Sequence, residues 1–170
     1  MEQAINNPYR TPDAELVKIA DASSALKLGR FSAWAVFGLT VITLGIYPLY
    51  WMYTHAITIN TLHENKISTA LLVSLVIATL LSFASNFMDQ TQPEIIIAGG
   101  VIGIVYMVLY LVVLFKIRNR LQDILSQACG GSFRVGPVLT FFFFVIYLQY
   151  KINQCIDMIS STPVEADTSS

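Results

Sequence analysis

The stretch TLGIYPLYW, Thr43–Trp51, places a glycine and a proline three residues apart inside an apolar run. Glycine adopts turn conformations that other residues avoid, and a proline inside a helix removes the hydrogen bond to the carbonyl four residues back. The stretch therefore predicts a break in the chain. Either Gly45 turns a re-entrant segment, with Thr43 as a cap and Pro48 opening a second helix, or the run is a single kinked span.

The composition around this stretch is that of an integral membrane protein. Of 170 residues, 55% are hydrophobic and 12% are charged, and the mean hydropathy is +0.61, whereas a soluble domain carries about 25% charged residues. We expect a cytoplasmic N-terminal segment 1–30 without a cleavable signal, one helical membrane domain 31–159 and a disordered tail 160–170. The net charge of −1 leaves no basic surface for nucleic acid.

Four apolar runs organise the membrane domain, at about 33–53, 69–88, 95–115 and 135–150. The middle two reach about 30 Å as helices, which is the thickness of a hydrocarbon core. The short connection between them predicts a central antiparallel hairpin. The first and last runs are interrupted by glycine and proline, so each is either re-entrant or a kinked span. The predicted fold is all-α.

Small residues on the two central runs suggest how they pack. Helices associate closely in lipid where small side chains share a face, and such residues recur here at a spacing of four. The predicted packing residues are Ser74, Ala78 and Ser82 on the second run and Gly99 and Gly103 on the third. The alternative is that small residues are simply frequent in membrane helices.

The positive charges test the topology, because cytoplasmic flanks are enriched in Lys and Arg. Four bases precede the first run, Lys66 follows it, four lie between the third and fourth runs, and Lys151 follows the last. Four crossings would divide the ten bases five and five. Two crossings, with the outer runs re-entrant, would place all ten on one side. Both topologies stay open at this point.

The opening stretch has an echo one hundred residues later. Residues 39–50 (LTVITLGIYPLY) and 139–150 (LTFFFFVIYLQY) share five identities in twelve positions without a gap. Each copy carries two tyrosines three apart, on one helical face; these are Tyr47 and Tyr50, then Tyr147 and Tyr150. Together with Trp51, the tyrosines predict an interfacial aromatic belt or, as the alternative, a ligand-binding cluster.

Three bases, Lys116, Arg118 and Arg120, directly follow the third run. Bases at this position contact anionic headgroups, at roughly 1 kcal/mol each, or they dock a soluble partner. Gly130-Gly131 predicts the end of their helix.

Signs of chemistry are sparse. The four apolar runs contain no Asp, Glu, Lys or Arg, which argues against an ion-coupled carrier. No activated nucleophile or phosphate-binding loop is present, so we expect neither an enzyme nor a cofactor. His55 and His63, with Glu64 beside the second, are the candidate metal ligands. They lack a third convincing ligand, which argues against a metal site. Two cysteines without a CxxC spacing predict free thiols in a reducing compartment.

The motif TLGIYPLYW, with the trailing YLQYKIN at 147–153, resembles the bacterial membrane-protein family called domain of unknown function 4234, over about residues 30–155. The leader NPYRTP, residues 7–12, is similar to that of small proteobacterial membrane proteins. The resemblance implies an inner-membrane location and no known activity. We expect a non-enzymatic scaffold or accessory subunit that packs against membrane-protein partners or shapes the bilayer. The alternative is an oligomeric solute or lipid pathway, without ion coupling, lined by the four tyrosines.

Overall fold

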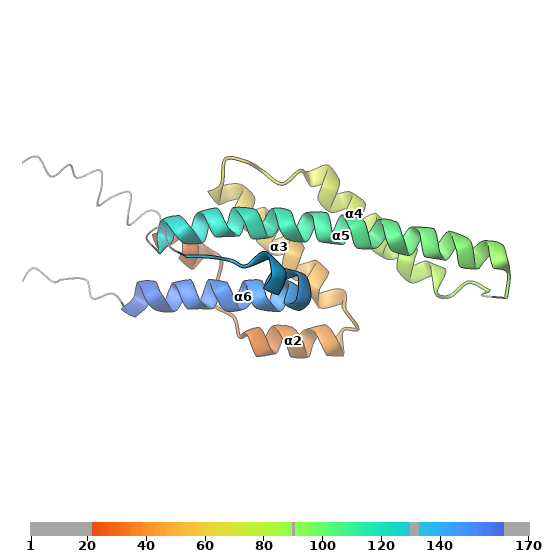
Figure 1. Cartoon of the computed structure of the whole chain (residues 1–170), viewed down its shortest axis with the longest axis horizontal. Helices are drawn as coiled ribbons and strands as arrows, with labels where there is room; N and C mark the ends of the chain where they lie inside the picture. Colours follow the sequence, from red (N-terminus) through yellow and green to blue (C-terminus); the bar gives the residue numbers. More distant parts are fainter. Residues whose placement is uncertain (1–21, 90, 130–132, 162–170) are drawn as a thin grey trace, which may run out of the picture.

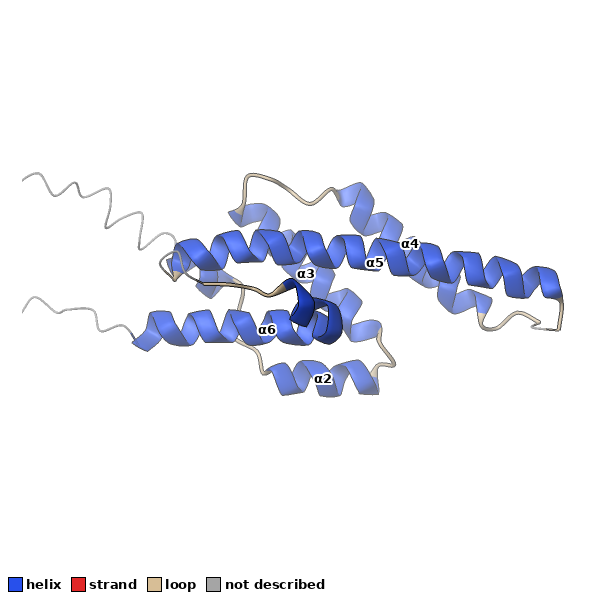
Figure 2. Cartoon of the chain, viewed as in Figure 1, coloured by secondary structure: helices blue, strands red, loops and turns tan. Residues whose placement is uncertain are grey.

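The computed structural model describes residues 22–89, 91–129 and 133–161, and all regular structure within these ranges is helical (Figures 1 and 2). This confirms the all-α prediction. After a short helical stretch at residues 22–27, the helices, labelled as in Figure 1, are α2 (Ala33–Ile42), α3 (Ile46–Leu62), α4 (Thr69–Ser85), α5 (Pro93–Ala128) and α6 (Pro137–Ser161). The NPYRTP leader and the tail from residue 162 onward lie outside the described residues.

The first apolar run forms two helices. Helix α2 ends at Ile42 and α3 begins at Ile46, with Leu44 at φ 50° and Gly45 at φ 88° between them. After this turn α3 runs back toward the end of the molecule where α2 began (Figure 1). The predicted break is therefore a true turn. Pro48 lies at the third helical position, not the first, but its missing N–H is still one that the first turn leaves unpaired.

Helices α4 and α5 form the predicted antiparallel hairpin (Figure 1). Pro93 and Glu94 open α5 as a first-turn proline and an acid at the positive helix end. Helix α5 has 36 residues, about 54 Å, and continues well past the apolar run. By length and composition it is the one described helix able to cross a membrane, while α2 and α4 are apolar but shorter.

A small-residue contact of this hairpin joins Gly99 to Ser85. A Cβ built on Gly99 would lie 3.7 Å from the Ser85 hydroxyl oxygen, whereas one on Gly103 would meet nothing within 4 Å. Ala78 is buried, but Ser74 is exposed and its hydroxyl donates to a carbonyl of its own helix. The contact thus lies three residues beyond Ser82, and the buried face of α4 is completed by leucines.

Helix α6 is the fourth run, extended to Ser161 and broken inside. Phe144 has φ 46° and ψ −132°, which separates a short first part from a longer second part. The first part lies across the second (Figure 1). Pro137 begins the helix, and the break at Phe144 means that the run is not a straight span.

The buried core lies where α3, α5 and the second part of α6 meet. Its largest fully buried side chains include Trp51, Met52, Leu114, Leu121 and Ile152. Toward its N-terminus, by contrast, α5 packs on α4 alone (Figure 1). Large apolar side chains are exposed there, including Ile96, Ile97, Val101 and Ile104 on α5 and Leu80, Leu81 and Phe83 on α4.

Three chain junctions gather at the C-terminal end of α5. Arg30, before α2, forms an ion pair at 3.0 Å with Asp157 of α6. His63, after α3, lies 3.3 Å from Asp123 of α5. A disulfide joins the end of α5 to α6. The loop between α4 and α5 lies at the opposite end of the molecule (Figure 1).

Candidate functional site

The two halves of the sequence echo break at the same position. Leu44 and Phe144, one hundred residues apart, are the two non-glycine residues with positive φ in the described chain, at 50° and 46°. Four residues earlier, Thr40 and Thr140 each donate the hydroxyl to the carbonyl four residues back, at 2.7 and 2.8 Å. The weak sequence echo therefore corresponds to a repeated local structure.

The first break is held by one threonine. The Thr43 hydroxyl donates to the Leu39 carbonyl at 2.7 Å and accepts from the Tyr47 N–H at 2.9 Å. It thus ends α2 and caps α3, as the sequence predicts. The N–H of Gly45, a residue at φ 88°, donates to the Thr40 carbonyl at 2.8 Å. Because the turn satisfies its own backbone groups, it suits a region without water.

The second break is held by hydrogen bonds from residues outside its own turn, on α5 and on the later part of α6. The Gly136 N–H donates to the Tyr147 hydroxyl at 3.0 Å, which ties the start of α6 to the part beyond the break. Val135 is fixed to α5, where its carbonyl accepts from Arg118 Nε at 2.9 Å and its N–H donates to Gln122 at 3.0 Å. Here tertiary contacts from α5 and α6 supply what Thr43 supplies in the first break.

The two breaks lie beside the middle of α5, and together with it they line a half-open cavity of about 380 Å³. Its walls are the first break, the second break and the middle of α5. The side chain of Phe144 packs edge-on against Tyr110, with ring centres 5.8 Å apart. The lining is apolar except for the Thr40, Tyr106 and Tyr110 hydroxyls and some backbone; it includes Gly45, Pro48, Met107, Leu111, Phe141 and Val145.

The sequence profile of the family described as "Domain of unknown function (DUF4234)" matches residues 31–123, more than half of the chain. The chain belongs to this family. The match contains the first break, α4 and most of α5, and it ends before α6, so YLQYKIN lies outside it. Among curated proteins and solved structures, no significant match is found.

A buried polar contact joins the DUF4234 region to α6. Trp51 Nε1 donates to Gln149 Oε1 at 2.8 Å, and both side chains are almost fully buried. Gln149 Nε2 donates in turn to the Gly29 carbonyl at 3.3 Å and to Asn153 Oδ1 at 3.1 Å. Trp51 thus has a specific partner that an interfacial belt does not require. The sequence offers no signal that would pair it with a glutamine 98 positions away.

His55 stacks on this tryptophan, with ring centres 3.7 Å apart. Its Nδ1 lies 2.9 Å from the Trp51 carbonyl, which only accepts, so Nδ1 carries the proton. Burial lowers the pKa of His55 to about 4, against the raising effect of hydrogen bonding to the backbone of Trp51 and of Leu28. The residue is therefore neutral near pH 7.

The four tyrosines of the echo do not form one group in the DUF4234 chain. Tyr47 contacts Tyr50 and Phe31, with ring centres 6.1 and 6.5 Å apart. The hydroxyl of Tyr147 accepts the hydrogen bond from the Gly136 N–H. Tyr50 and Tyr150 are both more than half exposed. The tyrosines that line the cavity are instead Tyr106 and Tyr110 of α5, which sequence reasoning did not select because they lie outside the echo.

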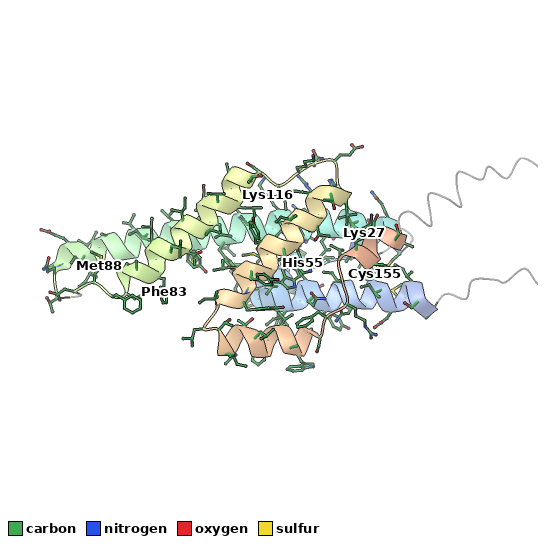
Figure 3. All side chains as sticks on the ribbon, turned by 180° about the vertical axis from the view of Figure 1, so that it is seen from behind. Lys27, His55, Phe83, Met88, Lys116 and Cys155 are labelled. Carbon is green, nitrogen blue, oxygen red and sulfur yellow. A yellow bond between two sulfur atoms is a disulfide. The ribbon has the colours of Figure 1, made fainter. Side chains whose placement is uncertain are left out.

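The three bases after the apolar part of α5 have different surroundings. Lys116 is exposed (Figure 3). Arg118 is half-buried and holds the loop before α6, and Arg120 donates to the Asn65 carbonyl at 2.8 Å. Two of the three are thus engaged inside the chain, and Lys116 has the freest access to headgroups or a partner.

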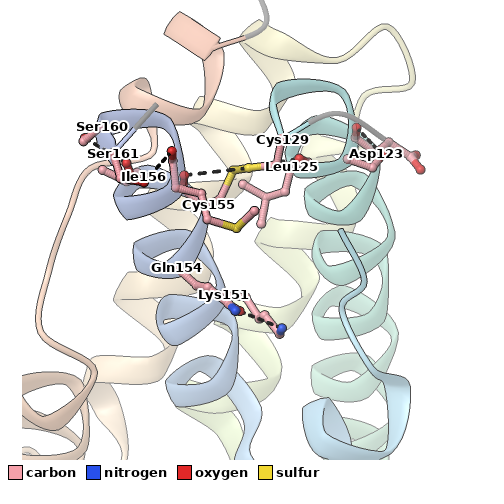
Figure 4. Close-up of a disulfide and its surroundings, with 11 residues drawn as sticks. Asp123, Leu125, Cys129, Lys151, Gln154, Cys155, Ile156, Ser160 and Ser161 are labelled. Atoms are coloured by element: carbon pink, nitrogen blue, oxygen red, sulfur yellow. Dashed lines mark hydrogen bonds between the residues drawn. A yellow bond between two sulfur atoms is a disulfide. The ribbon is translucent and has the colours of Figure 1, made fainter. Parts of the chain in front are cut away.

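The prediction of free thiols is wrong for this structure. Cys129, after α5, and Cys155, on α6, form a disulfide with Cα atoms 6.2 Å apart (Figure 4). Their separation of 26 residues carries no pairing signal, because the contact depends on the packing of α5 against α6. Gly130-Gly131 lies outside the described residues. Within those residues, no group of three or more His, Cys, Asp and Glu side chains could hold a metal ion.

Proposed function

We propose that this DUF4234 protein is a non-enzymatic, multi-pass membrane protein that shapes the bilayer or scaffolds membrane partners through two helical segments inserted part-way into one leaflet. Helices α4 and α5 cross the membrane, and the segments around Leu44 and Phe144 enter it and return. The observation that carries the proposal is the pair of breaks at corresponding positions of the echo, both beside the middle of α5.

The gathering of chain junctions supports this topology. Arg30, His63 and Cys129 all contact residues at the C-terminal ends of α5 and α6, which favours placing them on one side of the membrane. Two crossings put all ten bases on that side, in agreement with the rule that cytoplasmic flanks are positive. The charges near the opposite tip are Asp89 and Glu94. On the charge rule this side is proposed to face the cytoplasm, in a bacterial inner membrane, where the thiols of Cys129 and Cys155 would be kept reduced.

Shape links this topology to a function. One half of the molecule contains α2, α3, α6 and part of α5, whereas the other half contains only α4 and the rest of α5 (Figure 1). Such a body displaces more lipid from one leaflet than from the other, and so it favours curved bilayer. Large exposed apolar side chains on α2, α4 and α5 suit contact with lipid or with membrane partners.

Reconstitution tests the proposal. The purified protein is incorporated at increasing density into liposomes of phosphatidylethanolamine and phosphatidylglycerol, and vesicle diameters are measured by cryo-electron microscopy. We expect the mean diameter to fall as protein density rises. Diameters that do not depend on protein density would contradict bilayer shaping and leave scaffolding of partners, which copurification from native membranes tests.

A matched pair of variants connects the effect to the first break. Gly45→Val places a β-branched residue at φ 88°, a conformation that L-residues avoid at a cost of about 1–2 kcal/mol. Gly38→Val makes the same change on α2, where a Cβ meets nothing within 4 Å. We expect Gly45→Val to weaken the effect on vesicle diameter and Gly38→Val to preserve it.

A further inference from the structure

We propose that the cavity between the two breaks binds a neutral lipid whose polar end is a carbonyl group, with the chemistry of an isoprenoid quinone. The proposal goes beyond bilayer shaping and takes from the proposed function only that α5 is embedded in lipid. It rests on the volume, lining and depth of the cavity.

The cavity is large enough for such a ligand. Its volume is about 380 Å³, while an apolar cavity of about 150 Å³ holds a benzene molecule. A substituted ring with the first part of an isoprenoid chain therefore fits. Aromatic rings of Tyr106, Tyr110, Phe141 and Phe144 line the space, and they provide faces and edges on which a flat ring packs.

Two hydroxyl groups give the cavity its polarity. Within the described residues, the hydroxyls of Tyr106 and Tyr110 make no hydrogen bond, and neither oxygen is sealed from the surface. A phenol is a good donor, and leaving it unpaired in an apolar environment has a free-energy cost. A carbonyl oxygen of the ligand would accept from these hydroxyls. No charged side chain lines the cavity, so a neutral ligand is favoured over an ion.

Depth separates this ligand from a phospholipid. Tyr110 and Tyr106 lie six and ten residues before Lys116, about 9 and 15 Å along α5 from the first base of its polar part. Phospholipid headgroups stay at the membrane interface, whereas a neutral quinone ring enters the hydrocarbon region. The hydroxyls are thus placed where a quinone carbonyl can reach them.

Backbone strain marks the same place. The positive φ of Phe144, a bulky residue, is a conformation that persists only when its surroundings enforce it, and such residues cluster at ligand sites. This strained residue contributes its ring to the cavity wall against Tyr110. The strain and the free hydroxyls are independent observations on one site.

The test uses the full-length protein in detergent micelles with decylubiquinone as the probe, and native mass spectrometry to count bound probe. We expect one probe per chain. Leu111→Trp fills the cavity and should abolish the adduct, while Val112→Trp, on the exposed neighbouring position of α5, should retain it. Tyr106→Phe combined with Tyr110→Phe keeps both rings and should weaken binding about tenfold or more, through two lost hydrogen bonds.

Each outcome decides the proposal. Unchanged binding in the double tyrosine variant overturns recognition of a carbonyl, and an unchanged adduct in Leu111→Trp overturns the cavity as the site. Copurified phospholipid that decylubiquinone does not displace overturns the quinone-like ligand. Because binding is measured in micelles, its failure is distinct from a failure of the topology or of the effect on vesicles.

Discussion

Replacing Gln149 with leucine is expected to destabilise the protein by removing the only partner of a buried tryptophan N–H within the described chain. Trp51 Nε1 donates to Gln149 Oε1 at 2.8 Å, and the two side chains are 2% and 1% exposed. Leucine conserves much of the volume but accepts no hydrogen bond. The variant therefore leaves the indole N–H buried and unpaired, and the packing is otherwise similar.

The magnitude follows from this one donor. A buried polar group left without its partner costs about 1–3 kcal/mol. Gln149 also donates to the Gly29 carbonyl and to Asn153 Oδ1. These two acceptors belong to more accessible residues, so water can replace Gln149 as their donor in the variant. We therefore expect a loss of about 1–3 kcal/mol in the free energy of unfolding. For a chain of this size, each kcal/mol shifts the Tm by about 2–4 °C.

The assay is thermal unfolding in detergent, followed by circular dichroism, with Gln154→Leu as the control. Gln154 is only half-buried and bonds to Lys151 on its own helix, so the same change there should alter the Tm little. In a double-mutant cycle, Trp51→Phe with Gln149→Leu should cost about 1 kcal/mol less than the sum of the single changes. A Gln149→Leu variant that unfolds at the wild-type temperature, or a fully additive cycle, would refute the assigned contact.

Three further predictions address topology, redox state and pH. Single cysteines at Ser32 and Glu64, in a Cys-free background, should show the same accessibility to a membrane-impermeant thiol reagent in right-side-out vesicles; opposite accessibility of the two positions contradicts a re-entrant first segment. Cys155→Ala should lower the free energy of unfolding by about 3.5 kcal/mol, given the sequence separation of 26 between the paired cysteines, and a thiol-reactive polymer should modify the wild type only after reduction. Because the folded pKa of His55 is about 4 against 6.5 in the unfolded chain, the unfolded state binds more protons between these values. Stability should therefore fall by up to about 3 kcal/mol as the pH drops from 7 to 4, and His55→Phe should flatten this dependence in thermal unfolding.

Local chemistry explains which parts of the fold were predictable. Gly45 and Thr43 act within a few residues of the chain, so the first break and its cap could be predicted from TLGIYPLYW. The hairpin of α4 and α5 follows in the same way from two apolar runs and a short connection. The second break was only suggested by the echo, because Phe144 has no intrinsic preference for positive φ. Contacts of Val135 and Tyr147 hold the region around it.

The sequence by itself determined the helical class, the apolar runs and the position of the first turn, because hydropathy, glycine and proline act locally. Only the tertiary structure decided that Trp51 pairs with Gln149, that Cys129 meets Cys155, and that the two breaks line a cavity together with Tyr106 and Tyr110. Each of these contacts joins segments that are far apart in the chain. Their partners are set by the packing of α3 and α6 on α5, and no periodic pattern along the sequence encodes that packing.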